Sequence, residues 1–193
     1  TPEYEKYFQP DTPIKIPARN LMFNGNTSNT IAVFHQTDSS CLRMLDSAYL
    51  YDPLLDEGSQ RLIPMSDVSR IIPDPEPASP DTDIFGPEPA HTWCYFFQKA
   101  DLARQMKDWN ATIDLYQQAQ ALGFTPKYGA EYIPFIEAFA QTGDWQTAYD
   151  LTITAKELSQ QQKRMLCANW YRFAELPSAD PRMIDRVVQD LPC

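Results

Sequence analysis

Residues 96–124 read FFQKADLARQMKDWNATIDLYQQAQALGF, and this stretch decides how the second half of the chain folds. Its apolar residues recur at helical spacing on both sides of Lys107-Asp108, which predicts two helices joined by a short turn. Asp108 is a good N-cap for the second helix, and Gly123 is well suited to follow its last turn. The stretch therefore predicts a helical hairpin.

The same form returns further along the chain. Residues 132–158 read YIPFIEAFAQTGDWQTAYDLTITAKEL, and their Asp144-Trp145 stands 36 residues after Asp108-Trp109. Self-similarity at this period indicates a helical solenoid. Two more helices are expected at 163–176 and 181–191, the latter with Asp180 as its N-cap.

These features resemble the tetratricopeptide repeat, whose turn motif stands here as Gly143-Asp144-Trp145 and Lys107-Asp108-Trp109. The chain departs from the family at Ile136, where a small residue is usual, and at Pro134. The helix there is expected either to begin at Pro134 or to kink at it.

The resemblance implies a stack of antiparallel helix pairs with a groove lined by the first helix of each pair, in which such repeats bind peptides. By the family's pattern, the groove-facing positions are Phe97, Asp101, Arg104 and Glu137. The alternative interpretation of these positions is a solvated helix face.

A second resemblance covers most of the chain. GNTS at 25–28, CLRMLD at 41–46 and WCYFFQKADLARQ at 93–105 look like segments of uncharacterised bacterial multi-pass membrane proteins, which carry a soluble domain of this size after their spans. It implies a domain on the extracytoplasmic side of the bacterial cytoplasmic membrane; the alternative is a cytoplasmic one.

The first part of the chain is expected to hold a small β segment. Residues 1–20 contain spaced prolines and predict an extended entry. Residues 21–23 and 30–34 suit two short strands, with a hairpin turn at Asn24-Gly25-Asn26. The stretch after Cys41 fits a strand or a short helix equally well, so that 21–55 is either a hairpin plus a strand or a hairpin plus a helix.

Prolines and acids crowd residues 73–89, and this composition predicts an extended linker. The expected organisation is a β-containing segment at 1–72, a linker at 73–92 and a repeat domain at 93–193. The predicted fold class is α+β, with the β segment joined through the linker to a tetratricopeptide-like helical stack.

Charge and hydropathy argue against two kinds of partner, nucleic acid and the interior of a membrane. The chain of 193 residues has a formal net charge of −10 and no clustered Lys and Arg, which argues against nucleic acid. It also has no run of 18 or more apolar residues, so no direct insertion of this segment into a membrane is expected.

Four cysteines allow two disulfides. Cys94 and Cys167 occupy nearly the same place two repeats apart, too far for a bond, whereas Cys167 and Cys193 fall near the same end of the last helical hairpin. In an oxidising compartment the expected pairs are therefore Cys167–Cys193 and Cys41–Cys94. The alternative is four free thiols.

No catalytic constellation, cofactor motif or metal-ligand spacing is evident, and a Cys41 nucleophile with His35 as base lacks a third, orienting residue. The leading hypothesis is a protein-interaction module that docks another protein or the membrane part of its own parent chain. The alternative is an accessory domain of a membrane enzyme handling lipid-linked sugars, with the chemistry outside this chain.

Overall fold

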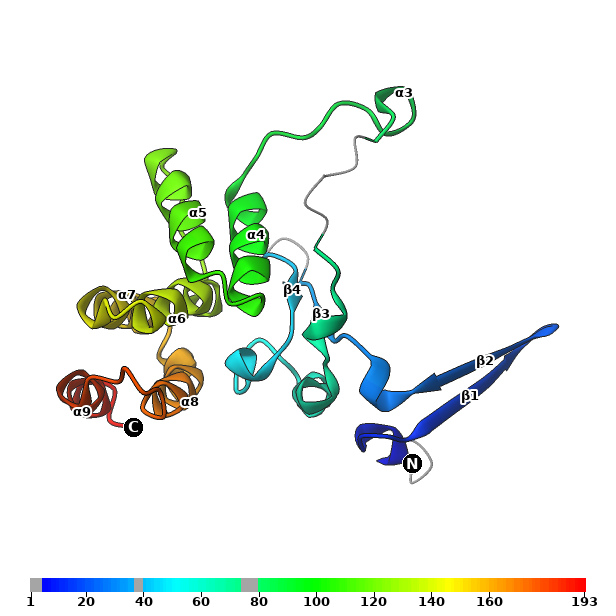
Figure 1. Ribbon diagram of the computed structural model, residues 1–193, viewed down its shortest axis with the longest axis horizontal. Helices are drawn as coiled ribbons and strands as arrows, with labels where there is room; N and C mark the ends of the chain where they lie inside the picture. Colours follow the sequence, from blue (N-terminus) through cyan, green and yellow to red (C-terminus); the bar gives the residue numbers. More distant parts are fainter. Residues whose placement is uncertain (1–4, 37–39, 74–79) are drawn as a thin grey trace.

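The computed structural model describes residues 5–36, 40–73 and 80–193. This part of the chain is mostly helical and carries two small antiparallel sheets of two strands each, as the α+β prediction requires (Figure 1). None of its helices is both long enough and apolar enough to cross a membrane.

The second half folds into consecutive helix pairs. Short turns join the members of each pair, and contacts link each helix to the next along the chain. The pairs are α4 (Trp93–Gln105) with α5 (Trp109–Ala121), α6 (Ile133–Gln141) with α7 (Trp145–Leu158), and α8 (Lys163–Phe173) with α9 (Pro181–Asp190).

Aspartate caps begin the second helix of each pair, as predicted for Asp108 and Asp180. The carboxylates of Asp108, Asp144 and Asp180 accept hydrogen bonds from backbone N–H groups two or three residues ahead. Gly123 follows α5 with a φ of 78°, a left-handed conformation that glycine adopts without steric cost. Local capping chemistry thus accounts for these helix boundaries.

Pro134 causes no break in its helix. A 3-10 helix at Gly129–Tyr132 leads directly into α6, so Pro134 falls in the first turn, where no intrahelical N–H bond is lost. The helix therefore does not kink at Pro134. It begins one residue earlier, at Ile133, close to the start expected at Pro134.

The predicted hairpin of residues 21–34 is wrong. β1 (Pro13–Ala18) pairs with β2 (Leu21–Asn26), and the turn falls at Arg19-Asn20, with a φ of 54° at Arg19. Gly25 lies inside β2, where a Cβ atom would meet the Phe23 ring at 2.8 Å. The glycine thus makes room for an aromatic ring and does not form a turn.

The stretch after Cys41 contains both structures that its sequence allowed. β4 (Arg43–Met44) pairs with β3 (Val33–Phe34), and a 3-10 helix follows at Ser47–Tyr49. The remaining elements are short: η1 (Lys6–Phe8), η2 (Thr27–Asn29), α2 (Glu57–Leu62), η4 (Ile63–Met65), η5 (Val68–Arg70), α3 (Thr82–Phe85) and η7 (Gln160–Gln162).

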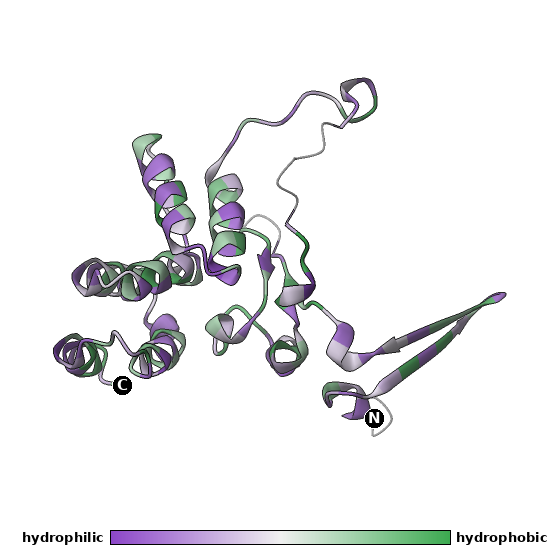
Figure 2. Cartoon of the chain, viewed as in Figure 1, coloured by the Kyte–Doolittle hydropathy of each residue, from purple (hydrophilic) through white to green (hydrophobic). Residues whose placement is uncertain are grey.

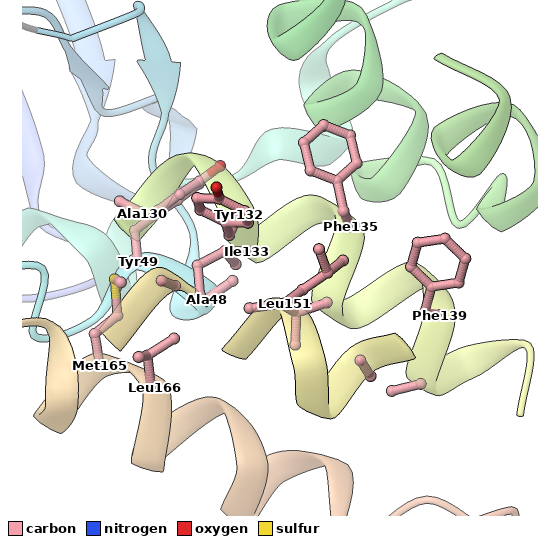
Figure 3. Packing of buried hydrophobic residues seen from close by; sticks show 14 of the residues in the cluster. Ala48, Tyr49, Ala130, Tyr132, Ile133, Phe135, Phe139, Leu151, Met165 and Leu166 are labelled. Carbon is pink, nitrogen blue, oxygen red and sulfur yellow. The ribbon is translucent and has the colours of Figure 1, made fainter. Parts of the chain in front are cut away.

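One hydrophobic core joins the two halves of the chain. Residues 41–63 contribute Leu45, Ala48 and Tyr49 to the same cluster that the helices build. Figure 3 shows Ala48 and Tyr49 lying among side chains of α6 and α8. In the expected linker at 73–92, Pro73 and residues 80–92 are exposed apart from the half-buried Gly86, while residues 74–79 lie outside the described part.

Candidate functional site

The residues predicted to line the groove do come together. Arg104, near the end of α4, donates to Asp101 one turn earlier at 2.8 Å, to Glu137 of α6 at 3.1 Å and to Asp46 at 2.6 Å. Phe97 lies on the same helix and is fully buried. These contacts lie between α4 and α6, which pack against each other.

A second arginine extends the network to α8. Arg172 donates to the same Glu137 carboxylate at 2.8 Å and to Asn169 at 2.7 Å. Asn169 in turn donates to the backbone carbonyl of Ala48 at 2.8 Å. The first helices of the three pairs are thus connected to one another and to the N-terminal segment.

The positions predicted to line a groove are covered by the chain itself. The side chains of Asp101, Arg104 and Glu137 are each at most 5% exposed, because residues 43–52 lie over them. Gln105 also donates to the backbone carbonyl of Met44 at 3.0 Å, which fixes this covering segment on α4. The four predicted positions are therefore neither a solvated helix face nor a groove open to an outside partner.

Burial controls the ionisation of this cluster. It raises the pKa of the Asp101 carboxyl, even though Arg104 favours the charged form. Burial opposes the charge on Arg104, yet Asp101, Asp46 and Glu137 together hold its pKa well above the ordinary value. The pKa of the covering Tyr49 is also raised strongly by burial. The cluster is an internal charge network.

Sequence reasoning missed a second buried ion pair in the covering segment. Arg43 pairs with Asp52, and both side chains are fully buried. The Arg43 guanidinium also lies 5.0 Å from the centre of the Phe34 ring and 5.5 Å from that of Tyr49. The sequence did hold one signal for this ion pair, because Arg43 is a charged residue in the apolar stretch that follows Cys41.

Two disulfides fasten the covering segment and the C-terminus. Cys41–Cys94 and Cys167–Cys193 have Cα separations of 5.2 and 5.7 Å. This is the pairing expected for an oxidising compartment, and the alternative of four free thiols does not hold. Because Cys41 is bonded to Cys94, it is not available as a nucleophile for His35.

A cavity of about 600 Å³ lies beside the Cys41–Cys94 bond. Glu131 in its wall accepts from Trp93 Nε1 at 2.8 Å and from the backbone N–H of Lys127 at 2.9 Å and of Cys41 at 3.2 Å. These donors satisfy the buried carboxylate. Among the described residues, no group of three or more His, Cys, Asp and Glu side chains is placed to hold a metal ion.

The β1–β2 hairpin extends away from the helices (Figure 1). Its register puts apolar residues opposite one another, pairing Ile14 with Gly25, Ile16 with Phe23 and Ala18 with Leu21. Side chains of directly opposed residues share a face. We call this face, formed by Ile14, Ile16, Ala18, Leu21 and Phe23, the hairpin face.

The hairpin face is open to solvent except at Ile14, which is half-buried and lines a cavity with Leu62 and Met65. Leu21 is 78% exposed, Phe23 56% and Ile16 52%. Figure 2 shows apolar residues along both strands of this projecting element. Comparison of the chain with protein-family models, curated proteins and solved structures finds no match.

Proposed function

We propose that this chain is a protein-docking domain on the extracytoplasmic side of a bacterial membrane. In this proposal tetratricopeptide-like helices form a rigid base, and the hairpin face makes the contact with the partner. The observation that carries the proposal is the hairpin face itself, because an all-apolar sheet face requires a cover. The two disulfides support an oxidising location.

Physical chemistry favours an external cover for the hairpin. An isolated two-stranded hairpin is only marginally stable in water, and large exposed apolar patches mark interaction sites. Ile14, at the base of the hairpin, lines a cavity with Leu62 of α2 and Met65 of η4, but the rest of the hairpin projects away from the helices, which do not cover it (Figure 1). A partner is therefore needed both to bury the face and to stabilise the strands.

The strand edges indicate how such a partner approaches. Pro13 and Pro17 lie on β1 and have no N–H, so they must occupy positions whose donors would point away from β2. The outer edge of β1 is consequently a poor template for another strand. We therefore infer docking on the hairpin face, with the outer edge of β2 as the edge of this hairpin that is better able to take a further strand.

In-cell photocrosslinking tests the proposal. A photoreactive residue at Leu21 or Phe23 is expected to give a defined crosslinked protein in the source cell. The matched control is Leu122, which is 62% exposed on the helical part. Equal, diffuse labelling from both positions, or no crosslink from the hairpin, would refute docking by this face.

The alternative function, an accessory domain of a membrane enzyme handling lipid-linked sugars, is favoured by one observation. The 600 Å³ cavity has the volume of a small-molecule site, and Phe124, Tyr128 and Lys127 contribute to its lining. An open reading frame with many hydrophobic spans before this segment would support this function. An open reading frame without such spans would remove it.

A further inference from the structure

Another cavity, of about 370 Å³, lies beside the Cys167–Cys193 disulfide. Its lining comes from three parts of the chain: the turn at Tyr51, one face of α8, and the C-terminal residues that the disulfide holds in place. The volume falls within the range of small-molecule sites. Figure 1 shows α8 and the C-terminus at the other side of the molecule from the β1–β2 hairpin, so this cavity is separate from the hairpin face.

One face of α8 gives the cavity positive charge and an aromatic ring. Arg164, Ala168 and Tyr171 follow one another at intervals of four and three residues, which places them on the same face of this helix. Arg164 and Tyr171 are about 10 Å apart along the helix axis, at about 1.5 Å per residue. Ala168 contributes only a methyl group to the lining between them, and Lys163 adds a second cation beside Arg164.

The protein does not neutralise these two cations. Neither Lys163 nor Arg164 forms a salt bridge or a side-chain hydrogen bond with any of the described residues. Both stand in the first turn of α8, which contains no acid, and the helix dipole disfavours cations at this end. This positive site lies in a chain with a net charge of −10. The two cations therefore do not stabilise the helix, and together with its N-terminus they favour an anion in the cavity.

Tyr51 orients one of the cations. The Arg164 Cζ atom lies 3.8 Å from the centre of the Tyr51 ring, so the guanidinium contacts the face of the ring. A guanidinium stacked in this way keeps its N–H groups available for two parallel hydrogen bonds to a carboxylate or a phosphate. Tyr51 has a φ of 69°, a left-handed conformation that is rare for an aromatic residue and concentrates at functional sites. Because Tyr49 and Asp52 on either side of it are fully buried, this strained turn holds Tyr51 firmly at α8.

We propose that this cavity binds a small anion that carries a ring, with the phosphate or carboxylate at Arg164 and Lys163 and the ring against Tyr171. The Tyr171 side chain is 51% exposed and its ring has no aromatic partner among the described residues, so it can stack on a sugar or an aromatic ring. The Cys167–Cys193 disulfide fixes the C-terminal wall, so the site is largely formed before the ligand binds. The proposal is independent of the docking function assigned to the hairpin face.

Nuclear magnetic resonance titration of the isotope-labelled full chain under non-reducing conditions tests this proposal. Phenyl phosphate or glucose 6-phosphate is expected to bind with a Kd below about 10 mM and to shift the amide resonances of residues 163–171 and Cys193. Inorganic phosphate, phenol and glucose each supply only one part of such a ligand, so each should bind at least about tenfold more weakly. Benzoate and glucuronate, titrated in the same way, distinguish a carboxylate ligand from a phosphate ligand.

Substitutions at exposed residues separate the two contributions. R164A should weaken binding at least about fivefold, because it removes charged hydrogen-bond donors. Y171A should weaken it about threefold or more, whereas Y171F keeps the ring and should bind as the unchanged chain does. R182A is the matched control, because it removes the same charge from a side chain of α9 that is 91% exposed. Urea unfolding of each variant confirms that the fold is retained.

Three results would overturn the proposal. The first is that none of the ring-bearing anions binds with a Kd below about 10 mM. The second is that R182A weakens binding as much as R164A, which would show a general attraction of anions to the surface. The third is binding that R164A and Y171A leave unchanged, with resonance shifts around Lys127, which would place the ligand in the cavity beside Cys41–Cys94. None of these results affects crosslinking through Leu21, which reports on the hairpin face.

Discussion

Replacing Arg104 by methionine should reveal how much the internal charge network contributes to stability. Met has a similar length but no charge, so the substitution removes the cation from three carboxylates with little change in volume. Glu137 keeps Arg172 as a partner at 2.8 Å. Asp101 and Asp46 lose the one cation that the described structure pairs with each of them.

The expected loss is large because the remaining charges are buried. The Asp101 side chain is 5% exposed and that of Asp46 17%. Removing one partner of a buried ion pair costs about 3–5 kcal/mol, since the other charge stays out of water. We expect R104M to lower the free energy of unfolding by about that amount. R182M is the control, because the Arg182 side chain is 91% exposed.

The loss in the free energy of unfolding caused by R104M should become smaller as the pH falls. A carboxyl whose pKa is raised by folding stabilises the native state below its unfolded pKa, and that stability is lost as pH rises through the folded value. The pKa of Asp101 is already raised by burial, and losing Arg104 removes the interaction that opposes this shift. The R104M penalty should therefore be smaller at pH 5 than at pH 8.

Urea unfolding under non-reducing conditions, followed by tryptophan fluorescence, measures both effects. Adding D101N to R104M removes the more deeply buried of the two uncompensated carboxylates and should recover about 1–3 kcal/mol. A penalty below about 1 kcal/mol, or one that grows on acidification, would show that water reaches Asp101 and that the network is not buried as described.

Three further predictions concern the shared core. The fragment 93–193 should give a weak, non-cooperative melt by circular dichroism, because it lacks the N-terminal residues that complete the core; a sharp transition would show that the helices suffice. Replacing Cys41 and Cys94 by serine should lower stability by about 4 kcal/mol in urea unfolding, from a sequence separation of 53. Gly129→Ala should cost about 1–3 kcal/mol, because its Cβ would lie 2.6 Å from Gln162 Cγ and 3.2 Å from a backbone oxygen; an unchanged melting temperature would contradict this packing.

Local chemistry made the helical half predictable. Apolar residues at helical spacing and aspartate caps at 108, 144 and 180 act within a few residues, so they can be recognised without knowledge of the fold. The β1–β2 register escaped prediction because two signals were ambiguous. Pro13 and Pro17 suit an extended segment as well as an edge strand, and Gly25 suits a turn as well as a strand that makes room for a ring.

The filled groove depends on contacts that leave no local signal. Asp101 and Arg104 have the spacing of a polar face on one helix, and their burial depends on contacts with distant residues such as Asp46 and Glu137. The expected Cys41–Cys94 disulfide did indicate that the segment after Cys41 lies against α4. A bond from Cys41 to the first turn of α4 brings the following residues to the start of the groove.

Because of the same bond, we expect an outside peptide to compete poorly for the positions predicted to line a groove. A tethered segment binds its own surface at an effective concentration of about millimolar or more, and the disulfide shortens the tether of residues 43–52 to a few residues. A competitor must also replace the Asp46 carboxylate at Arg104 and the Ala48 carbonyl at Asn169. Since these contacts are satisfied within the molecule, displacing them gains little free energy. Binding free energy is available where apolar surface is still exposed to water, and the hairpin face has such surface. This difference is why we assign docking to the hairpin and a structural role to the groove.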